Sequence, residues 1–410
     1  MHPYHHWLTA PVRLEEVVVT VATKPGVFAH GAHDPAADML AQWIAAAGPQ
    51  AIATDGDRPR SVHLQAGNGL VAAVAGAQGY LAMACDRSAP NAAAAARTLA
   101  LSSGQQPLGD AAEAVQHVGI PGKHVADGEA ALVTIRIPTD RLGIQLAVAE
   151  AFRMLRGGGV CLLAGGNDEG AKPAAKLLQA VFGNASVEAQ HSGHRMVRAA
   201  KVSATPGDEA IFSLPWLDLS HFHAVPVAFA GADDTVLEFS QFTRPGVFSW
   251  EHLDEATSLL ADIMNIRPGD RVLDLGCGAG ALGVVATVRS GVPAVLVDAD
   301  ADAVRGAQRT VEGAGLSGVQ VLASDVGSAV KGQSFDVVVT NPPFHVGKAT
   351  DLTVPQAFID DAWEVLAPGG RLYLVANRTL PYERLIHARF GEVRVAHDGR
   401  RFKVLGAVRS

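Results

Sequence analysis

Short apolar runs alternate with stretches of helical apolar spacing along the second half of the chain. Each run has the length of a buried strand, and the stretch that follows it places its apolar residues on one helical face. Two further runs, separated by Asp398 and Gly399, predict a β-hairpin. The alternation predicts an α/β fold with an open and largely parallel sheet. We expect its strands near residues 271–275, 293–298, 319–323, 335–340, 371–376, 392–395 and 402–407.

Four of these strands carry a polar residue at or just after their carboxyl end. These residues are Asp274, Asp298, Asp325 and Asn341. The carboxyl ends of parallel strands meet at one edge of a sheet, and open α/β sheets bind their ligands at that edge. The four polar residues therefore predict a binding site.

A glycine-rich turn joins the first of these strands to an apolar helix that starts near Ala281. Gly276, Gly278 and Gly280 allow the backbone to turn tightly and to approach a ligand without a clash from a Cβ atom. The start of the helix offers free N–H groups and a partial positive charge, which favour an anionic group. Dinucleotide-binding enzymes use similar turns, so the turn alone does not identify the ligand.

The first half of the chain repeats the second with an offset of about 210 residues. The matched pairs are 23–28 with 243–248, 81–86 with 293–298, and 151–163 with 362–374. An offset of this size predicts duplicated domains rather than a solenoid. We expect domains at residues 1–205 and 236–410, with a packed connecting segment at 206–235.

The two copies differ at the positions where a ligand would bind. His63 stands in place of Asp274, and Gln65 stands in place of Gly276, where its long side chain would fill the space that glycine leaves. The run Asn341-Pro342-Pro343-Phe344 is also missing from the matching residues 133–138. We therefore expect a degenerate, non-catalytic first domain.

Composition and charge constrain the class of protein. The chain has 410 residues, of which 48% are hydrophobic and 18% charged, as expected for folded domains. Its net charge of −8 argues against a general polyanion binder. Residues 371–410, however, carry nine Lys/Arg and three Asp/Glu, a local charge of +6. This excess predicts either a solvated face or an RNA-facing patch.

The cysteines and the N-terminus favour a cytoplasmic protein without metal. Cys85, Cys161 and Cys277 show neither metal-ligand spacing nor a disulfide framework, which favours buried thiols in a reducing compartment. The first residues lack the pattern of a signal peptide, and no apolar run has the length of a membrane helix. His5 and its neighbours His2 and His6 fit an exposed, mobile terminus better than a metal site.

The order of these motifs resembles that of the class I S-adenosylmethionine (SAM) methyltransferases. Asn341-Pro342-Pro343-Phe344 is similar to the motif of enzymes that methylate a nitrogen conjugated to a planar system. With His345, Val375–Asn377, Pro381-Tyr382 and Phe402–Val404, it resembles the bacterial ribosomal RNA guanine-N2 methyltransferases of the RsmC type. The resemblance implies two tandem Rossmann-like, seven-stranded methyltransferase domains. The first would be a scaffold or an RNA-docking domain.

The resemblance also implies SAM as the cofactor, S-adenosylhomocysteine as the product, and no metal. The turn formed by Gly276, Cys277, Gly278 and Gly280 would receive the methionine carboxylate, and Asp274 would accept from the ammonium group. Asp298, with Ala299 beside it, would bind the ribose hydroxyls, or Asp298 could instead cap the helix at 301–313. Asp325 and Val326 would bind adenine, or Asp325 could cap a short helix.

The Asn-Pro-Pro motif would carry the chemistry, with Asn341 next to both cofactor and substrate. Asn341 Oδ1 and the Pro342 carbonyl would accept from the guanine amine and help re-localise its lone pair. Pro342 and Pro343 have no N–H, so this rigid loop accepts hydrogen bonds and does not donate them. Phe344 would stack on the base. His345 would contact the base or cap the following residue.

The implied function is SAM-dependent methylation of guanine N2 in 16S ribosomal RNA of the small subunit. The partner would be this RNA or the assembled small subunit, bound by a monomer near Phe344 and Arg378. The alternatives are the same reaction on 23S RNA, protein glutamine N5-methylation, and a non-catalytic ribosome-assembly factor. Phe344 argues against the glutamine enzymes, which usually have Tyr there, and the intact Asp274 and Asn341 argue against the assembly factor.

Overall fold

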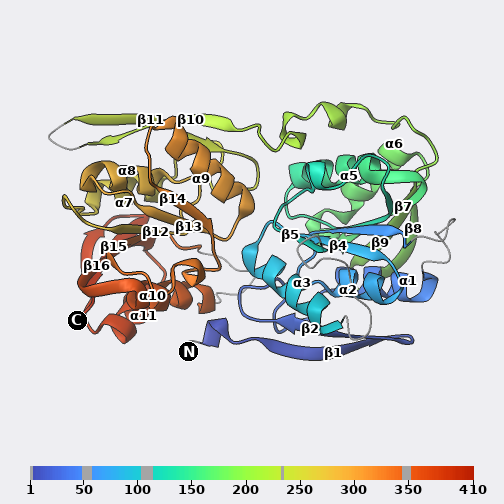
Figure 1. The fold of residues 1–410 in the computed structure, drawn as a ribbon, viewed down its shortest axis with the longest axis horizontal. Helices are drawn as coiled ribbons and strands as arrows, with labels where there is room; N and C mark the ends of the chain where they lie inside the picture. Colours follow the sequence, from blue (N-terminus) through green and yellow to red (C-terminus); the bar gives the residue numbers. More distant parts are fainter. Residues whose placement is uncertain (1–2, 49–57, 103–113, 232–234, 344–351) are drawn as a thin grey trace. The chain divides into compact units, whose positions relative to one another are not determined.

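The computed structural model describes residues 3–48, 58–102, 114–231, 235–343 and 352–410 (Figure 1). His6–His221 form one compact unit, and Phe222–Ser410 form the other together with the N-terminal residues up to His5. The division after His221 lies inside residues 206–235, the connecting segment predicted from the sequence.

The C-terminal unit contains a seven-stranded sheet in the order β14-β13-β12-β15-β16-β18-β17. The pairs that involve β18 are antiparallel, and the other pairs are parallel. The strands are β12 (Val272–Leu275), β13 (Val295–Asp298), β14 (Gln320–Ala323), β15 (Phe335–Thr340), β16 (Leu366–Asn377), β17 (Arg394–Asp398) and β18 (Phe402–Val408). The helices are α7 (Glu255–Ile263), α8 (Ala281–Ser290), α9 (Ala301–Gly313), α10 (Thr353–Val365) and α11 (Tyr382–Phe390).

The N-terminal unit repeats this order as β5-β4-β3-β6-β7-β9-β8. Its strands are β3 (Arg60–Leu64), β4 (Leu81–Cys85), β5 (Val115–Gln116), β6 (Ala130–Arg136), β7 (Leu155–Gly166), β8 (Ser186–His191) and β9 (His194–Ala200). Its helices are α1 (Pro35–Ala47), α2 (Leu70–Ala77), α3 (Ala89–Ser102), α5 (Arg141–Met154) and α6 (Ala171–Phe182). The predicted fold class, two tandem Rossmann-like domains with seven strands each, is confirmed.

An antiparallel hairpin precedes the sheet in each unit. In the N-terminal unit it consists of β1 (Leu8–Leu14) and β2 (Val17–Thr23), and in the C-terminal unit of β10 (His223–Ala230) and β11 (Val236–Thr243). β11 packs against α9, and Figure 1 shows the hairpin along the outer side of α8 and α9. The contact is close, because a Cβ atom added at Gly306 would lie 2.6 Å from the Phe242 carbonyl oxygen.

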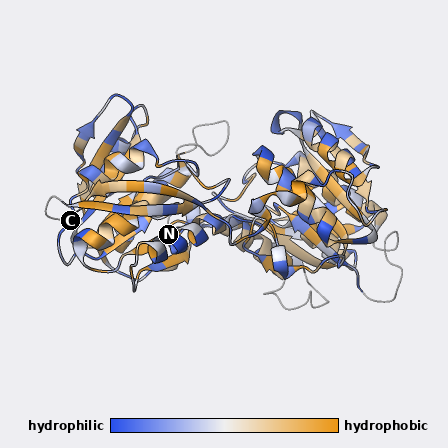
Figure 2. Ribbon diagram, turned by 90° about the horizontal axis from the view of Figure 1, so that it is seen from above, coloured by the Kyte–Doolittle hydropathy of each residue, from blue (hydrophilic) through white to orange (hydrophobic). Residues whose placement is uncertain are grey.

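Alternation along the strands divides the core of the C-terminal unit between the two faces of its sheet. Successive strand side chains point to opposite faces. Leu273 and Leu275 pack with α10 and α11, whereas Val272 packs with α7 and α8. Asp274 therefore points toward the α8 side, where it is 1% exposed. Figure 2 shows polar and apolar residues along the helices of each unit, as expected for helices with one buried face.

Tyr4 and His5 do not belong to the exposed, mobile terminus that the sequence predicts, whereas His6 is exposed and His2 lies outside the described residues. Tyr4 is 2% exposed and belongs to the hydrophobic core of the C-terminal unit. His5 pairs with Asp361 on α10. For Tyr4 and His5 the expectation was wrong because it rested on the polar composition of the first residues, which carries no information about contacts with residues more than 300 positions away.

No helix among the described residues is long and apolar enough to cross a membrane. The same residues include no group of three His, Cys, Asp or Glu side chains that could hold a metal ion.

Candidate active site

The strand order reverses between β12 and β15, and the carboxyl ends of these neighbours carry Asp274 and Asn341. Open α/β sheets bind ligands in the crevice at such a reversal. The Thr340 hydroxyl donates to the Leu275 carbonyl at 2.6 Å and holds the two strand ends together. The structure therefore brings the first and last of the four predicted edge residues to the expected binding position.

Asp274 is a buried carboxylate, and only one of its two oxygens has a hydrogen-bond partner among the described residues. Its Oδ2 accepts from the Gly283 N–H of α8 at 2.8 Å. Its Oδ1 has no hydrogen-bond partner among the described residues. Burial raises the pKa of Asp274 to about 7; the Gly283 N–H opposes the shift and the nearby Asp298 adds to it. A cationic donor placed at Oδ1 would satisfy this atom and restore the charged form.

The glycine turn has the geometry that the sequence predicts, and two of its glycines are also required by packing. Gly276 and Gly280 have φ angles of +77° and +87°. A Cβ atom at Gly276 would lie 2.8 Å from the Phe358 ring, and one at Gly280 would lie 3.0 Å from Ala307 Cβ. A Cβ atom at Gly278 would meet nothing within 4 Å, so open space lies next to the turn at this residue. Burial raises the pKa of the Cys277 thiol, which makes Cys277 a poor nucleophile.

Asp298 connects the glycine turn to the end of β13. Its Oδ2 accepts from the Gly278 N–H at 2.8 Å, and its Oδ1 accepts from the Asp300 N–H at 2.9 Å. Burial raises the pKa of Asp298 to about 6. The alternative role as the cap of α9 is wrong, because the side chain of Asp300 caps that helix. Asp298 therefore lies at the crevice with Ala299 next in the chain.

Asp325 and Val326 follow β14 at the same edge of the sheet. Asp325 is half-buried and does not cap the short helix Ser328–Val330, whose N-cap is Gly327. Val326 has a φ of +53°, a left-handed conformation that is costly for a β-branched residue. Such strain persists only where the surroundings hold the backbone in place.

The Asn341 side chain is fixed by Asp254 and Thr257, two residues outside the motifs that predict the site. Its Nδ2 donates to Asp254 Oδ2 and to Thr257 Oγ1, each at 3.0 Å. Its buried Oδ1 has no partner among the described residues. Asp254 is the N-cap of α7, and the spacing Asp254-Thr257 is the signal that could have placed these two residues together. The amide thus presents an unused acceptor.

Pro342 and Pro343 follow Asn341, the first buried and the second exposed. Phe344 and His345 lie outside the described residues. The chain at 341–343 therefore offers a carbonyl and an amide oxygen and, at the prolines, no donor.

The cations of residues 371–410 are mostly paired within the fold. Arg378 is 56% exposed, follows β16 at the carboxyl edge and donates from Nε to Asp398 Oδ1 at 2.9 Å. Lys403 is buried and pairs with Glu383 at 2.6 Å. The other ion pairs are Arg371 with Asp270, Arg389 with Asp360, and Arg401 with Glu255. The last three pairs use carboxylates from outside the segment and reduce its local excess from +6 to +3, so the segment is a weaker basic surface than its sequence suggests.

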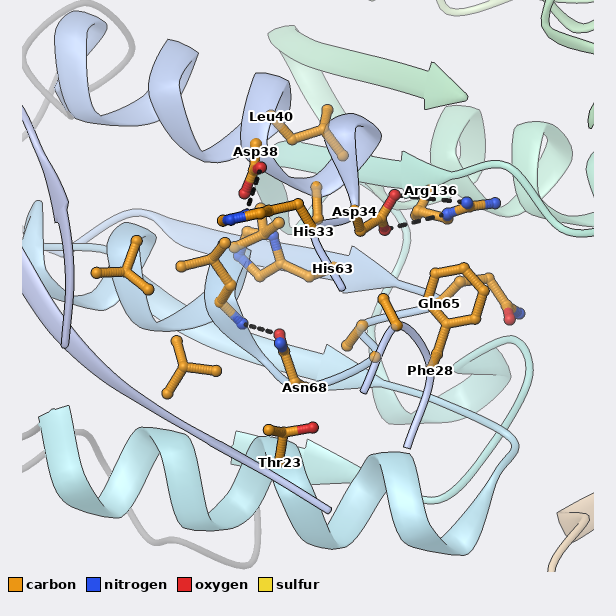
Figure 3. Close-up of a pocket in the computed structure, with 18 of the residues that line it drawn as sticks. Thr23, Phe28, His33, Asp34, Asp38, Leu40, His63, Gln65, Asn68 and Arg136 are labelled. Atoms are coloured by element: carbon orange, nitrogen blue, oxygen red, sulfur yellow. Dashed lines mark hydrogen bonds and ion pairs between the residues drawn. The ribbon is translucent and has the colours of Figure 1, made fainter. Parts of the chain in front are cut away.

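The first domain keeps the backbone of the site but not its chemistry (Figure 3). Gln65, at the position of Gly276, has a φ of +55°. Asp86 accepts from the N–H groups of Gly67 and Ser88, each at 2.9 Å, as Asp298 does from Gly278 and Asp300. His63 replaces the carboxylate of Asp274.

Both ring nitrogens of His63 have partners, Ser61 Oγ and Thr134 Oγ1, each at 2.9 Å. Burial lowers the pKa of His63 to about 3, so the ring is neutral. His63, Gln65 and Arg136 line a cavity of about 160 Å³. Figure 3 shows these side chains, with Arg136 paired to Asp34. This cavity offers a neutral ring at the position where the second domain offers a carboxylate.

Comparison with known proteins places the chain among methyltransferases. A family model described as "Methyltransferase small domain" matches residues 238–406. Ribosomal RNA small subunit methyltransferase C of Pseudomonas aeruginosa (strain UCBPP-PA14) is 34% identical over 257 residues, which cover 62% of this chain and 72% of the relative. The protein of the same name from Hahella chejuensis is 44% identical over 185 residues, which cover 44% of this chain and 53% of the relative. The match thus spans about half of the Hahella protein's length.

One solved structure is similar over the whole chain. It is the T. thermophilus 16S rRNA N2 G1207 methyltransferase (RsmC) in complex with AdoMet and guanosine. It is 29% identical with a TM-score of 0.79, and the match covers 100% of this chain and 99% of that one. These matches confirm the resemblance that the sequence motifs indicated.

Proposed function

Because the chain belongs to the ribosomal RNA small subunit methyltransferase C family, we propose that it methylates the exocyclic N2 of a guanine in 16S ribosomal RNA, with SAM as the methyl donor. The observation that carries the proposal is the Asn341 amide, whose Nδ2 is fixed while its buried Oδ1 remains without a partner among the described residues. The names of the relatives favour small-subunit RNA over 23S RNA.

The residues at the crevice fit SAM. Asp274 Oδ1, the buried acceptor without a described partner, would receive the cofactor's ammonium group. The α8 N-terminus behind Gly276, Gly278 and Gly280 would receive its carboxylate. Asp298 would accept from the ribose hydroxyls, and Asp325 with the Val326 N–H would bind adenine. The sulfonium of SAM supplies a methyl group that is already activated for displacement.

Asn341 and Pro342 would orient the guanine amine. The lone pair of this amine is delocalised into the ring, so the nitrogen is a poor nucleophile. Acceptance of its two hydrogens by Asn341 Oδ1 and the Pro342 carbonyl would hold the amine in line with the methyl group and favour a localised lone pair. Displacement at an activated methyl depends on position more than on a general base. Phe344 would stack on the base.

Asp254 and Thr257 would set which way the Asn341 amide points. Both residues accept a hydrogen bond from Asn341 Nδ2. An ionised carboxylate is an acceptor and cannot donate a hydrogen bond. A flipped amide would place Oδ1 against the Asp254 carboxylate, which is electrostatically unfavourable. The pair thus keeps Oδ1 available for the substrate.

The first domain would serve as a scaffold or an RNA-docking domain, and the enzyme would act as a monomer on 16S RNA or on the assembled small subunit. Its neutral His63 and its Gln65 support a role without SAM.

The purified full chain should be incubated with methyl-labelled SAM and with small subunits or 16S RNA that lack the modification. Nucleoside analysis should then find label in N2-methylguanosine, and the matched Asn341→Ala chain should give none. Label in another nucleoside, in 23S RNA or in protein would overturn the proposal.

A further inference from the structure

The first residues of the chain contribute to the C-terminal unit at the adenine end of the candidate site. Tyr4 packs in the core of that unit beside residues of β12, β13 and α10. Its hydroxyl donates to Asp325 Oδ1 at 2.6 Å, across 321 positions of sequence. Burial, and next the charge of Asp325, raise the pKa of Tyr4, so the hydroxyl keeps its proton and remains a donor.

His5 holds the same loop through a second route. Its Nε2 lies 2.9 Å from Asp361 Oδ1, and Asp361 Oδ2 accepts from the Gly327 N–H at 2.9 Å. A Cβ atom at Gly327 would lie 2.9 Å from Asp361 Cβ, so the loop passes close to α10. Asp361 is buried and joins the N-terminal residues to residue 327.

The loop between these two contacts contains the strained residue Val326. Ser324 Oγ donates to the Val326 carbonyl at 2.6 Å, and Ser328 Oγ accepts from the Asp325 N–H at 3.1 Å. With Tyr4 and His5, these bonds hold a φ of +53° that a valine rarely adopts. The direction of the Val326 N–H and of the Asp325 carboxylate is therefore set in part from the N-terminus of the chain.

We propose that Tyr4 and His5 are positioning residues that fix the loop Asp325–Gly327 for recognition of the adenine amino group of the cofactor. The inference rests on the proposed use of SAM. A carboxylate has about four acceptor positions, so Asp325 accepts from Tyr4 and from an adenine amine together. The Tyr4 hydroxyl fixes the rotamer of Asp325 before the cofactor arrives, which lowers the cost of ordering on binding.

The test compares two ligands on the full chain by calorimetry. S-adenosylhomocysteine has the 6-amino group, and S-inosylhomocysteine has an oxygen in its place that cannot donate to Asp325. Tyr4→Phe should weaken binding of the adenosyl ligand by about fivefold and binding of the inosyl ligand much less. The expected loss is smaller than the tenfold or more of a deleted hydrogen bond to a charged group, because Tyr4 acts on the ligand only through Asp325. His5→Ala should likewise reduce the ratio of the affinity for the adenosyl ligand to the affinity for the inosyl ligand. Tyr80→Phe removes the hydroxyl of a buried tyrosine in the other unit and should leave the ratio unchanged.

Equal losses for both ligands would indicate a merely structural role and overturn the inference. Tighter binding of the adenosyl ligand by Tyr4→Phe would also overturn it, because the hydroxyl would then compete with adenine. Failure of the wild-type chain to bind either ligand would instead refute the proposed cofactor site, which Asp298→Ala tests independently.

Discussion

The ionised side chain of Asp274 should lower the free energy of unfolding of the cofactor-free protein. Replacement of Asp274 by asparagine should reveal by how much. The carboxyl group is 1% exposed, and burial raises its pKa from 3.8 to about 7. A raised carboxyl pKa means that the folded state holds the proton more tightly than the unfolded state does. The protonated carboxyl group therefore contributes its full share of the folding stability below the unfolded pKa. This contribution is lost as the pH rises through the folded pKa, because the buried group must then carry a charge.

The magnitude follows from the size of the shift. One pKa unit corresponds to about 1.4 kcal/mol, and the side chain is too deeply buried for solvent to screen the effect. Between about pH 5 and about pH 8 the cost grows over roughly two units, or about 3 kcal/mol, and then levels off above the folded pKa. Asparagine does not ionise, so the stability of Asp274→Asn relative to wild type should rise by about this amount across the interval.

Hydrogen–deuterium exchange of peptides from β12 and β15 measures the effect in the C-terminal unit alone, because the two units need not unfold together. Both chains are measured without cofactor at about pH 5 and about pH 8, with rates corrected for intrinsic exchange. Asp262→Asn, at an exposed position of α7, is the matched control and should show no such trend. A difference between Asp274→Asn and wild type that does not change with pH would refute the assigned pKa and the physical account of Asp274.

Four further predictions concern the site. Asn341→Ala should abolish methyl transfer while SAM affinity by calorimetry stays within about threefold, since Asn341 faces the amine; normal turnover would reject its role. Asp298→Ala should weaken SAM binding at least about tenfold through lost hydrogen bonds to a charged acceptor, and unchanged affinity would exclude a ribose role. One SAM should bind per chain, because His63 and Gln65 replace the needed groups; two equivalents in a titration would contradict this. Arg378→Ala should reduce the magnitude of the negative slope of log RNA affinity against log salt concentration by about 0.7–0.9 without altering SAM affinity. Unchanged RNA affinity and slope would favour the first domain as the RNA platform.

The edge of the sheet could be predicted from the sequence because the relevant signals are local. Buried strands give continuous apolar runs, and the polar residue that ends each run marks the carboxyl edge. Asp274, Asp298, Asp325 and Asn341 therefore all lie where the pattern indicated. β16 starts five residues earlier than expected, at Leu366, because its pairing with β15 shifts register between Phe335 and Val337.

The contacts that orient the site could not be predicted, because they join residues far apart in sequence. Asn341 meets Asp254 across 87 positions, and Tyr4 meets Asp325 across 321 positions. Neither partner has a local pattern that identifies the other. The left-handed conformation of Gln65 has no signal in the residue type itself, and only its repeat partner Gly276 points to it.

The surface charge of residues 371–410 could not be predicted from the sequence either, because ion pairs with distant residues reduce it. Counting residues 371–410 gives +6, but Arg371, Arg389 and Arg401 pair with carboxylates outside the segment. Net charge along the sequence therefore overestimates the positive surface. Arg378 is paired as well, but its partner Asp398 is also exposed, and exposed pairs contribute little energy, so a phosphate can replace the carboxylate.

The central claim is that this chain methylates a guanine N2 in 16S RNA through Asn341. Mass mapping of ribosomal RNA from a strain that lacks the gene tests it most directly, with the strain complemented by wild type or by Asn341→Ala. We predict that one N2-methylguanosine disappears from 16S RNA and returns only with the wild-type chain. Unchanged 16S RNA, a loss in 23S RNA, or restoration by Asn341→Ala would contradict the claim.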